Sequence, residues 1–309
     1  MQLGIFYSHP RTEEKALFAA AENDPKIELI KIRDSEIELD LHEDLQLLKC
    51  DAVLLRSVSH TKNFYLAKFL EARGVRTVND FETIAICGDK FLTSIRLAEK
   101  KVPTPKTKVC FDTDAALQTI EKWGYPVVMK PVVGSWGRLL SKIDNRDAAE
   151  TILEHKKVLG GITHSQIFYI QEFIEKKSGS DIRAVVIGDE VVAAMRRKSE
   201  HWITNTARGA SVENFKVTKD FEKLVLAAAK AVSEKTPACR LPVRCTCLPL
   251  HKQAQTGQAG ALLGVDLVET NEGLKVVEVN SGVEFHGLME ASEVDVPGKI
   301  IEFCRKVAG

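Results

Sequence analysis

Asp266, Glu278 and Asn280 carry side-chain oxygens within two otherwise apolar runs near the C-terminus. The runs lie in GVDLVETNEGLKVVEVNSG, residues 264–282. Two carboxylates that face each other repel and resist removal from water, so a protein that opposes them supplies a cation or protonates one. Carboxylate and amide oxygens suit Mg²⁺, which also takes phosphate oxygens and water. The three side chains therefore predict a magnesium site. The alternative is an exposed hairpin edge with solvated acids.

The hairpin that must position these side chains is predicted by the residues between them. Asn271, Glu272 and Gly273 form a three-residue loop, with glycine at the position that requires a left-handed backbone. Thr270 and Leu274 are then the first pair of the ladder. Counting outward gives the opposed pairs Val268 with Val276 and Asp266 with Glu278, and Asn280 lies on the same face as Glu278.

Two lysines and a glycine-rich loop are candidates for phosphate binding. Lys130 ends an apolar run and opens KPVVGSWGR, a loop whose backbone N–H groups at Gly134, Ser135 and Gly137 are expected to surround phosphate oxygens. The loop matches neither the P-loop nor the dinucleotide pattern, and a plain glycine turn is the alternative. Lys90, in CGDKFLT, opens a helix whose N-terminal dipole favours an anion. A solvated lysine is the alternative there.

A strand with a mixed apolar and polar end is the candidate for adenine binding. In YIQEFIE, residues 169–175, the main chain is available to pair with the edge of a base. Phe173 and Ile174 would give an apolar seat, and Gln171 or Glu172 a polar contact. Taken alone, the segment predicts only a strand.

Fixed positive charge is supplied by MRRKSEHWITNTARGA, residues 195–210. Arg196, Arg197, Asn205 and Arg208 fall in a strand end and a polar loop, where they would stabilise a phosphoryl group during transfer. Surface arginines are the alternative. No Ser/His/Asp or Cys/His arrangement stands out, and phosphoryl transfer needs positioning more than a nucleophilic side chain.

The elements that carry these residues fall into three predicted units. The runs QLGIFYS and DAVLLRSVS, with the helical TEEKALFAAAEN between them, indicate a small α/β unit over residues 1–86. A helix is predicted to start near Asp89 and to end before Pro103 and Pro105, and a strand–loop–strand–helix–strand unit follows, completing residues 87–175. The third unit, residues 176–309, starts with a hairpin turning at Gly188-Asp189, continues through a helix in TKDFEKLVLAAAKAVSE and contains the acidic hairpin.

Composition excludes several classes of protein. The 309 residues include 43 Lys plus Arg and 43 Asp plus Glu, so no overall basic field draws nucleic acid or anionic membrane. No long apolar stretch or signal peptide is evident, and the seven cysteines indicate free thiols, which together predict a cytoplasmic protein. Cys239, Cys245, Cys247 and His251 are close in sequence, but their spacing does not match common zinc motifs, so a structural zinc is the minor alternative to core packing.

Six features follow one another along the chain: Lys90, Lys130 with GSWGR, QEFIE, DIRAVVIGD, RRKSEHWITNTARGA and GVDLVET…VVEVNSGVEF. In this order they resemble the ATP-grasp ligases, specifically the RimK-like branch. GSWGR, HWITNTARGA and EVNSGVEFHGL are similar to the LysX and ArgX enzymes. The resemblance covers nearly the whole chain. It implies an α/β fold of the α+β ATP-grasp type, with an N-terminal α/β domain before a two-subdomain ATP-grasp fold.

The resemblance also implies an activity. Members of this family attach glutamate or α-aminoadipate to the C-terminal glutamate of a small acidic carrier protein, LysW, through an acyl-phosphate made with ATP and Mg²⁺, in lysine or arginine biosynthesis. A cytoplasmic homo-oligomer is expected.

Site roles follow from the same resemblance. The residues expected to bind ATP are Lys90, Lys130, Gly134, Ser135, Trp136, Gly137, Arg138, Gln171, Glu172, Phe173 and Ile174. Arg197, Asn205 and Arg208 are the expected catalytic stabilisers, and Asp266, Glu278 and Asn280 the magnesium ligands. Arg56, Ser57, Glu284 and Phe285 are candidates for substrate selection, with a packed strand end as the alternative. The basic pairs Lys156-Lys157 and Lys176-Lys177 are expected at the rim to dock the carrier.

One segment departs from the family pattern. Between the helix ending near Ser233 and the strand at Gly264, family members have a short turn, whereas residues 235–262 form a long stretch rich in proline, cysteine and basic residues. It is either a surface excursion, which costs little loop entropy, an artefact of the gene model, or a disruption that abolishes activity. The alternatives to the leading function are therefore a RimK-like ligase that adds glutamate to another protein or peptide, and an inactive nucleotide-binding protein.

Overall fold

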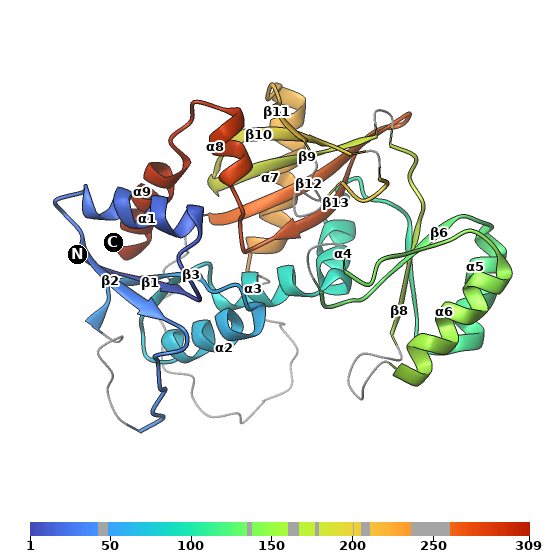
Figure 1. The fold of residues 1–309 in the computed structure, drawn as a ribbon, viewed down its shortest axis with the longest axis horizontal. Coiled ribbons are helices and arrows are strands. Elements are labelled where there is room, and N and C mark those ends of the chain that lie inside the picture. The colour runs from blue at the N-terminus through green and yellow to red at the C-terminus, as the bar shows by residue number, and fades with distance from the viewer. Residues whose placement is uncertain are drawn as a thin grey trace, which may run out of the picture.

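The computed structural model describes residues 1–42, 49–134, 138–159, 167–176, 179–199, 201–204, 211–235 and 260–309. Within these residues the chain forms three β-sheets, two of four strands and one of five, with helices packed on them (Figure 1). The strands of the three sheets come from successive parts of the chain. Whether the chain divides at residues 86/87 and 175/176 stays a prediction.

The N-terminal sheet is parallel, with strand order β2-β1-β3-β4. Its strands are β1 (Gln2–Tyr7), β2 (Glu28–Arg33), β3 (Ala52–Arg56) and β4 (Arg76–Val78), and its helices are α1 (Thr12–Glu22) and α2 (His60–Glu71). The predicted strand, helix and strand correspond to β1, α1 and β3. The prediction missed β2, because this edge strand is largely exposed and alternates charged with apolar residues. The order places a switch point between β1 and β3, where the loops after both strands meet.

Two helices connect this sheet to the central one. They are α3 (Phe81–Gly88) and α4 (Lys90–Glu99), and they meet at Asp89. The carboxylate of Asp89 caps α4 by accepting hydrogen bonds from the N–H groups of Phe91 and Leu92. The predicted helix start near Asp89 is therefore confirmed, and Lys90 is the first residue of α4.

The central sheet is antiparallel, with order β5-β8-β6-β7. Its elements are β5 (Thr107–Cys110), α5 (Thr113–Trp123), β6 (Val127–Lys130), β7 (Ser141–Ile143), α6 (Arg146–Leu159) and β8 (Phe168–Glu172). Both helices pack on one face, around a core that includes Ile120, Leu153 and Ile170. The sequence predicted the order from β6 to β8 but not β5 and α5, which lie just beyond the prolines.

The third sheet is antiparallel and has the order β11-β10-β9-β12-β13. Its strands are β9 (Ser180–Gly188), β10 (Glu190–Lys198), β11 (Ser211–Asn214), β12 (Ala261–Thr270) and β13 (Gly273–Asn280). Helix α7 (Lys219–Ser233) packs on one face of this sheet through Phe221 and Val225. Helices α8 (His286–Ala291) and α9 (Val296–Ala308) return to the N-terminal unit, where α9 lies beside α1 (Figure 1).

The register of the acidic hairpin differs from the prediction by one residue near its turn. Thr270 pairs with Gly273 rather than with Leu274, and Leu267 pairs with Val276, so the predicted pairing of Val268 with Val276 is wrong. A bulge between Asp266 and Leu267 then shifts the register by one residue. Asp266 consequently lies opposite Glu278, as predicted.

Asn79, after β4, joins the N-terminal unit to the acidic hairpin. Its side-chain amide donates to the carbonyl oxygens of Leu262 at 2.7 Å and Ser281 at 3.1 Å, and its oxygen accepts from the N–H of Leu262 at 2.7 Å. Asn79 is only 2% exposed. One buried side chain therefore fixes both the start of β12 and the loop that follows Asn280.

Candidate active site

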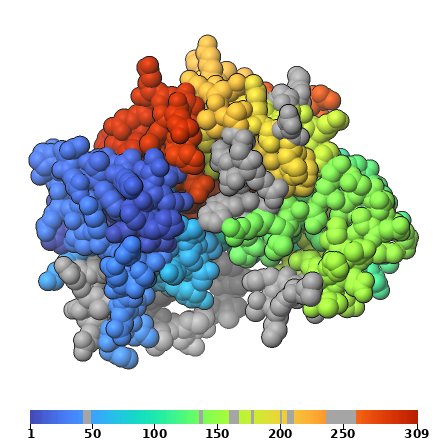
Figure 2. Space-filling model, viewed as in Figure 1, coloured from blue at the N-terminus to red at the C-terminus, as the bar shows by residue number. Residues whose placement is uncertain are grey.

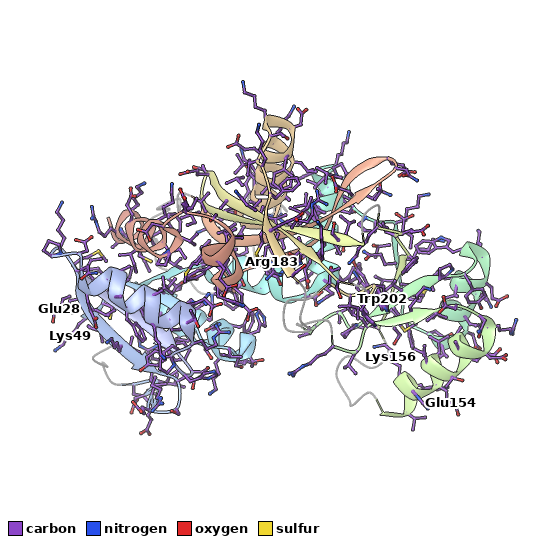
Figure 3. The ribbon with its side chains drawn as sticks, turned by 45° about the horizontal axis from the view of Figure 1, so that its top comes forward. Glu28, Lys49, Glu154, Lys156, Arg183 and Trp202 are labelled. Atoms are coloured by element: carbon purple, nitrogen blue, oxygen red, sulfur yellow. The ribbon has the colours of Figure 1, made fainter. Side chains whose placement is uncertain are left out.

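A cavity of about 550 Å³ lies between the central sheet and the third sheet. Arg183 on β9 and Trp202 beyond β10 belong to its walls, and Figure 3 shows them on the third sheet and towards the central sheet, respectively. Figure 2 shows the central unit, in green, and the N-terminal unit, in blue, at opposite ends of the molecule. The predicted site residues that line this cavity are Lys90, Lys130, Gly134, Arg138, Gln171, Glu172, Phe173, Ile174, Arg197, Asp266, Glu278, Asn280 and Glu284.

A row of charges crosses the third sheet on the cavity side. Asp266 lies opposite Arg183 on β9 and opposite Glu278 on β13. Arg183 holds Asp266 through two hydrogen bonds of 2.8 and 2.7 Å, and Arg197 adds a third of 3.0 Å. Burial would raise the pKa of Asp266, but the two guanidinium groups outweigh it and hold this pKa below its usual value.

The opposed carboxylates are therefore compensated by protein cations. Asp266 forms ion pairs with Arg183 and Arg197, and Glu278 forms one with Lys90 at 3.0 Å. The amide of Asn280 donates to Asp266 at 3.3 Å, which confirms that Asn280 lies on the same face as Asp266.

These residues fit a magnesium ion that arrives with a nucleotide. Glu278 is partly exposed, and its ion-pair partner among the described residues is Lys90, whose charge a phosphate group also attracts. Asn280 turns its nitrogen to Asp266, which leaves the amide oxygen to a cation. Two carboxylates and one amide give hard oxygen donors and leave further positions to phosphate and water. Among the described residues no group of three His, Cys, Asp or Glu side chains forms a metal site, so the amide is needed to complete this set.

Lys90 and Lys130 approach the cavity from two elements that are held together. The N–H of Lys90 donates to the carbonyl of Val132 at 2.8 Å, and Asp89 forms a β-bridge with Val133. The start of α4 is therefore fixed to the chain that leaves β6. Lys90 Nζ also donates to the carbonyl of Gly134 at 2.6 Å.

Lys130 is the more buried of the two lysines, and its pKa is lowered to about 8. Burial is the main cause, and Lys90 and Lys176 add to it, while Glu278 acts in the opposite direction. Lys130 donates to the side-chain oxygen of Gln171 at 2.6 Å. No carboxylate of the described residues forms an ion pair with Lys130, so its buried ammonium is ready to receive an anion, and a phosphate would restore its ordinary basicity.

The glycine-rich loop is described only at its two ends. Gly134 and Arg138 line the cavity, and Gly134 has a φ of 153°, a backbone conformation that favours glycine. Ser135, Trp136 and Gly137 lie outside the described residues. Their role in covering phosphates stays a prediction.

The segment predicted to bind adenine has two side chains that are already engaged. Gln171 accepts from Lys130 and donates to Thr107 at 3.0 Å, and the carboxylate of Glu172 accepts from Lys275 at 3.0 Å and from a backbone N–H. The main chain and the apolar side chains of Phe173 and Ile174 remain for a base. Phe173 also meets the ring of Trp202 edge-on, with centroids 6.2 Å apart.

Arg197 is fixed by two carboxylates. It donates to Asp181 at 2.6 and 2.9 Å as well as to Asp266, and it is 3% exposed. The neighbouring Arg196 lies on the opposite side of the strand and pairs with Glu269 at 2.6 Å. Asn205 and Arg208, predicted to act with Arg197, lie outside the described residues.

The cavity is also lined by polar residues to which the sequence assigned no role. They include Asp181, Arg183 and Thr204. Lys176 donates to Thr204 at 2.7 Å, and Thr204 donates to Asp181, so these groups continue the network of Arg197. Charged residues at alternate positions of the otherwise apolar strand DIRAVVIG were the available signal. Lys176 was expected on the rim but lines the cavity, and burial lowers its pKa.

A second cavity of about 190 Å³ adjoins the first and shares Gly134, Glu278, Asn280, Gly282 and Glu284 with it. Arg56 and Ser57 line this second cavity. Phe285 lines neither cavity, because its ring is fully buried in the core, 5.6 Å below the guanidinium of Arg56. The structure thus places Phe285 as support for the site.

The four residues of the alternative zinc site, Cys239, Cys245, Cys247 and His251, lie outside the described residues, as does most of the 235–262 segment. The described cysteines at positions 50, 87, 110 and 304 are free thiols. In the part of the chain that the structure describes, no helix has the length and apolar character needed to cross a bilayer.

Comparison with known proteins agrees with this geometry. Residues 87–237 and 251–304 match the RimK-like ATP-grasp domain, and residues 3–86 match the LysX preATP-grasp domain. The break between residues 237 and 251 falls inside the 235–262 segment.

Two LysW ligases are similar to this chain over most of its length. The chain is 31% identical over 309 residues to a glutamate–LysW ligase ArgX from Sulfurisphaera tokodaii, covering 99% of each protein. It is 33% identical over 254 residues to an α-aminoadipate–LysW ligase LysX from Saccharolobus solfataricus, covering 82% of each.

The fold has solved counterparts. A RimK-domain ATP-grasp protein from Sphaerobacter thermophilus superposes with a TM-score of 0.76 at 24% identity, covering 98% of this chain and 99% of that one. The predicted α/β class with an ATP-grasp fold is confirmed. The chain belongs to the RimK-like ATP-grasp ligase family, with a LysX-type domain preceding the ATP-grasp unit.

Proposed function

We propose that the protein is an ATP-dependent carboxylate–amine ligase that acts on a LysW-like carrier. It joins the α-amine of glutamate or α-aminoadipate to the side-chain carboxylate of the carrier's C-terminal glutamate. The γ-phosphate of ATP passes to that carboxylate, the amine attacks the acyl-phosphate, and phosphate leaves. The names of the two LysW ligases that the chain resembles support both the carrier and the amino acids.

One observation carries the proposal: two lysines on one side and the row of Arg183, Asp266 and Glu278 on the other line the same cavity. Polyphosphate needs several fixed cations, and transfer needs charge stabilisation where negative charge develops. The buried Lys130 supplies a fixed cation for the polyphosphate, and the guanidinium groups of Arg183 and Arg197 can stabilise the developing negative charge. Asp266, Glu278 and Asn280 would hold Mg²⁺, which when bound neutralises charge on the phosphates.

The apolar end of the cavity fits the other half of the nucleotide. Phe173, Ile174 and Trp202 lie beside a strand end whose main chain is available to a base edge. The cavity of about 550 Å³ falls in the usual range for small-ligand sites.

The choice between glutamate and α-aminoadipate depends on one methylene group, a difference of about 1–3 kcal/mol. Both amino acids are therefore proposed as substrates. The relatives favour the carrier over another protein or peptide as the acceptor. Assembly into a homo-oligomer stays an expectation.

The experiment is an intact-mass measurement. The purified protein is incubated with ATP, Mg²⁺, a LysW-like carrier and each amino acid in turn, and ADP is measured in parallel. We expect the carrier mass to rise by the amino-acid residue mass, with one ADP per adduct. The absence of both ADP and adduct with every carrier and amino acid would reject the proposal.

A further inference from the structure

We propose that the ion pair of Arg11 and Glu284 binds the head group of the incoming amino acid. Arg11 takes its α-carboxylate, and Glu284 binds its α-ammonium and removes a proton from it. This inference rests on the proposed function and assigns two residues of the same site.

The position of Glu284 is the first reason. Among the described residues, Glu278 and Glu284 are the carboxylates that line both cavities. Glu278 already faces Lys90 and belongs to the proposed metal set. Glu284 is thus the acid between the site of phosphoryl transfer and the second cavity. The second cavity, at about 190 Å³, has the size of an amino acid rather than a nucleotide.

The second reason is that the neighbouring carboxylates are already hydrogen-bonded to other side chains. Asp181 is held by Arg197 and Thr204, and Asp266 by Arg183 and Arg197. Among the described residues, the carboxylate of Glu284 has a single hydrogen bond, from Arg11 at 3.1 Å to one of its oxygens. It is 23% exposed at its side chain and Arg11 is 25% exposed, so a small ligand can reach both.

The support beneath the pair is the third reason. Glu14, which is fully buried, accepts from Arg11 at 2.9 and 3.0 Å and from Arg56 at 3.1 and 2.8 Å. Arg56 also donates to the carbonyl of Val283, the residue before Glu284.

This arrangement fixes the backbone of Glu284 while its carboxylate stays accessible. Arg56, with all of these bonds and 5% exposure, positions Glu284 rather than contacting substrate itself.

The charges match the ligand. An α-amino acid carries an ammonium and a carboxylate on one carbon, and Arg11 with Glu284 presents a cation and an anion side by side. Charged groups at such short range select a zwitterion over a simple amine or a simple acid.

Glu284 would act as the base in amine transfer. The ammonium gives one proton to the carboxylate of Glu284, which frees the nitrogen lone pair. The nitrogen attacks the acyl carbon and forms the C–N bond. The carbon–oxygen bond to the phosphate then breaks, and the phosphate leaves with its electron pair and takes the second proton from nitrogen.

The test separates acyl-phosphate formation from amine transfer. Glu284→Gln keeps shape and removes the charge. Hydroxylamine, which is largely neutral near pH 7, traps the acyl-phosphate of the carrier as a hydroxamate without a protein base. With ATP, Mg²⁺ and carrier, we expect Glu284→Gln to form hydroxamate within about threefold of the wild-type rate. With the amino acid as acceptor, we expect kcat/KM to fall about 100-fold, in the range for loss of a general base.

A control and a fold check accompany the variant. Glu290→Gln removes an exposed carboxylate on α8 and should leave both rates unchanged. The thermal midpoint of Glu284→Gln should match that of the wild type, because a partly exposed ion pair contributes little to stability.

Arg11 is tested with a second acceptor. Arg11→Lys, which keeps the charge beside Glu14, should lower kcat/KM about tenfold for the amino acid. It should change little for the corresponding amine without the α-carboxylate, because that ligand has no group for the guanidinium to bind.

Two results would overturn the inference. One is unchanged amino-acid kinetics in Glu284→Gln, and the other is an equal loss of hydroxamate and amino-acid product, which would mean that the residue serves phosphoryl transfer or folding. Failure of the wild-type protein to form hydroxamate with any carrier is a different result. It would reject the proposed function and this inference with it.

Discussion

Arg183 on β9 and Asp266 on β12 lie directly opposite each other and are joined by two parallel hydrogen bonds of 2.8 and 2.7 Å. Glu278 lies on the other side of Asp266, on β13. The arginine therefore keeps Asp266 ionised beside a second carboxylate and fixes the orientation of its oxygens. Bidentate pairing of this kind gives orientation as well as energy.

Removing Arg183 should destabilise the protein through the charge it leaves behind. We expect Arg183→Met to lower the free energy of unfolding by about 3 kcal/mol, the low end for a broken buried pair, because Arg197 still contacts Asp266. Adding Asp266→Asn should recover most of this loss, since no charge is then stranded. Urea unfolding of the two single variants and the double variant measures the coupling, and additive losses would contradict it.

Nucleotide binding should take up a proton above neutral pH. Burial lowers the pKa of Lys130 to about 8, so the free protein has lost most of this proton at pH 9, and phosphate should raise the pKa again. At pH 7 the lysine is protonated in both states and no uptake is expected. Calorimetry of ATP binding in two buffers of different ionisation enthalpy measures the uptake. Uptake that persists at pH 9 in Lys130→Met would assign it to another group.

Asn79 should stabilise the acidic hairpin that carries Asp266 and Glu278. Asn79→Ala removes three hydrogen bonds to buried backbone groups of Leu262 and Ser281, so we expect a loss of about 2 kcal/mol in the free energy of unfolding. Asn79→Asp should lose more, because it buries a carboxylate against the carbonyl oxygens of Leu262 and Ser281. The exposed Asn214→Ala is the matched control. A loss no larger than that of the control would show that this contact does not hold the hairpin.

Carrier binding should depend on salt and on the outer end of α6. Lys157 is exposed there, whereas Lys156 is half-buried over the ring of Phe168. We expect the Kd for an acidic carrier to rise with salt, and Lys157→Glu to weaken binding further at low salt. Lys223→Glu, on α7 across the sheet from the cavity, should bind like the wild type. Affinity that is constant from low to high ionic strength would reject docking by charge.

The sequence predicted much of the fold because the apolar periods of β1, α1, β9, β10 and α7 are strong. It predicted the pairing of Asp266 with Glu278 from a wrong loop length, and the bulge after Asp266 compensated for the error. Bulges depend on packing between strands, which the pattern of one hairpin does not contain.

Partners distant in sequence explain the remaining differences at the site. Arg56 is satisfied by Glu14, 42 positions away, and Gln171 by Lys130, 41 positions away. Sequence spacing identified each of these side chains as polar groups at strand ends. Only the fold shows that Arg56 positions a neighbour and that Gln171 supports a lysine.

We propose that Asp266, Glu278 and Asn280 form the magnesium site of the ligase. Glu278→Gln tests it better than a change at Asp266, because Glu278 is partly exposed and its loss leaves no arginine without a partner.

The measurement is the rate of carrier- and amino-acid-dependent ADP release as a function of Mg²⁺ concentration. We predict that Glu278→Gln raises the half-saturating Mg²⁺ concentration at least tenfold and lowers the maximal rate, while its unfolding midpoint stays unchanged. An Mg²⁺ dependence identical to that of the wild type would show that Glu278 is not a magnesium ligand.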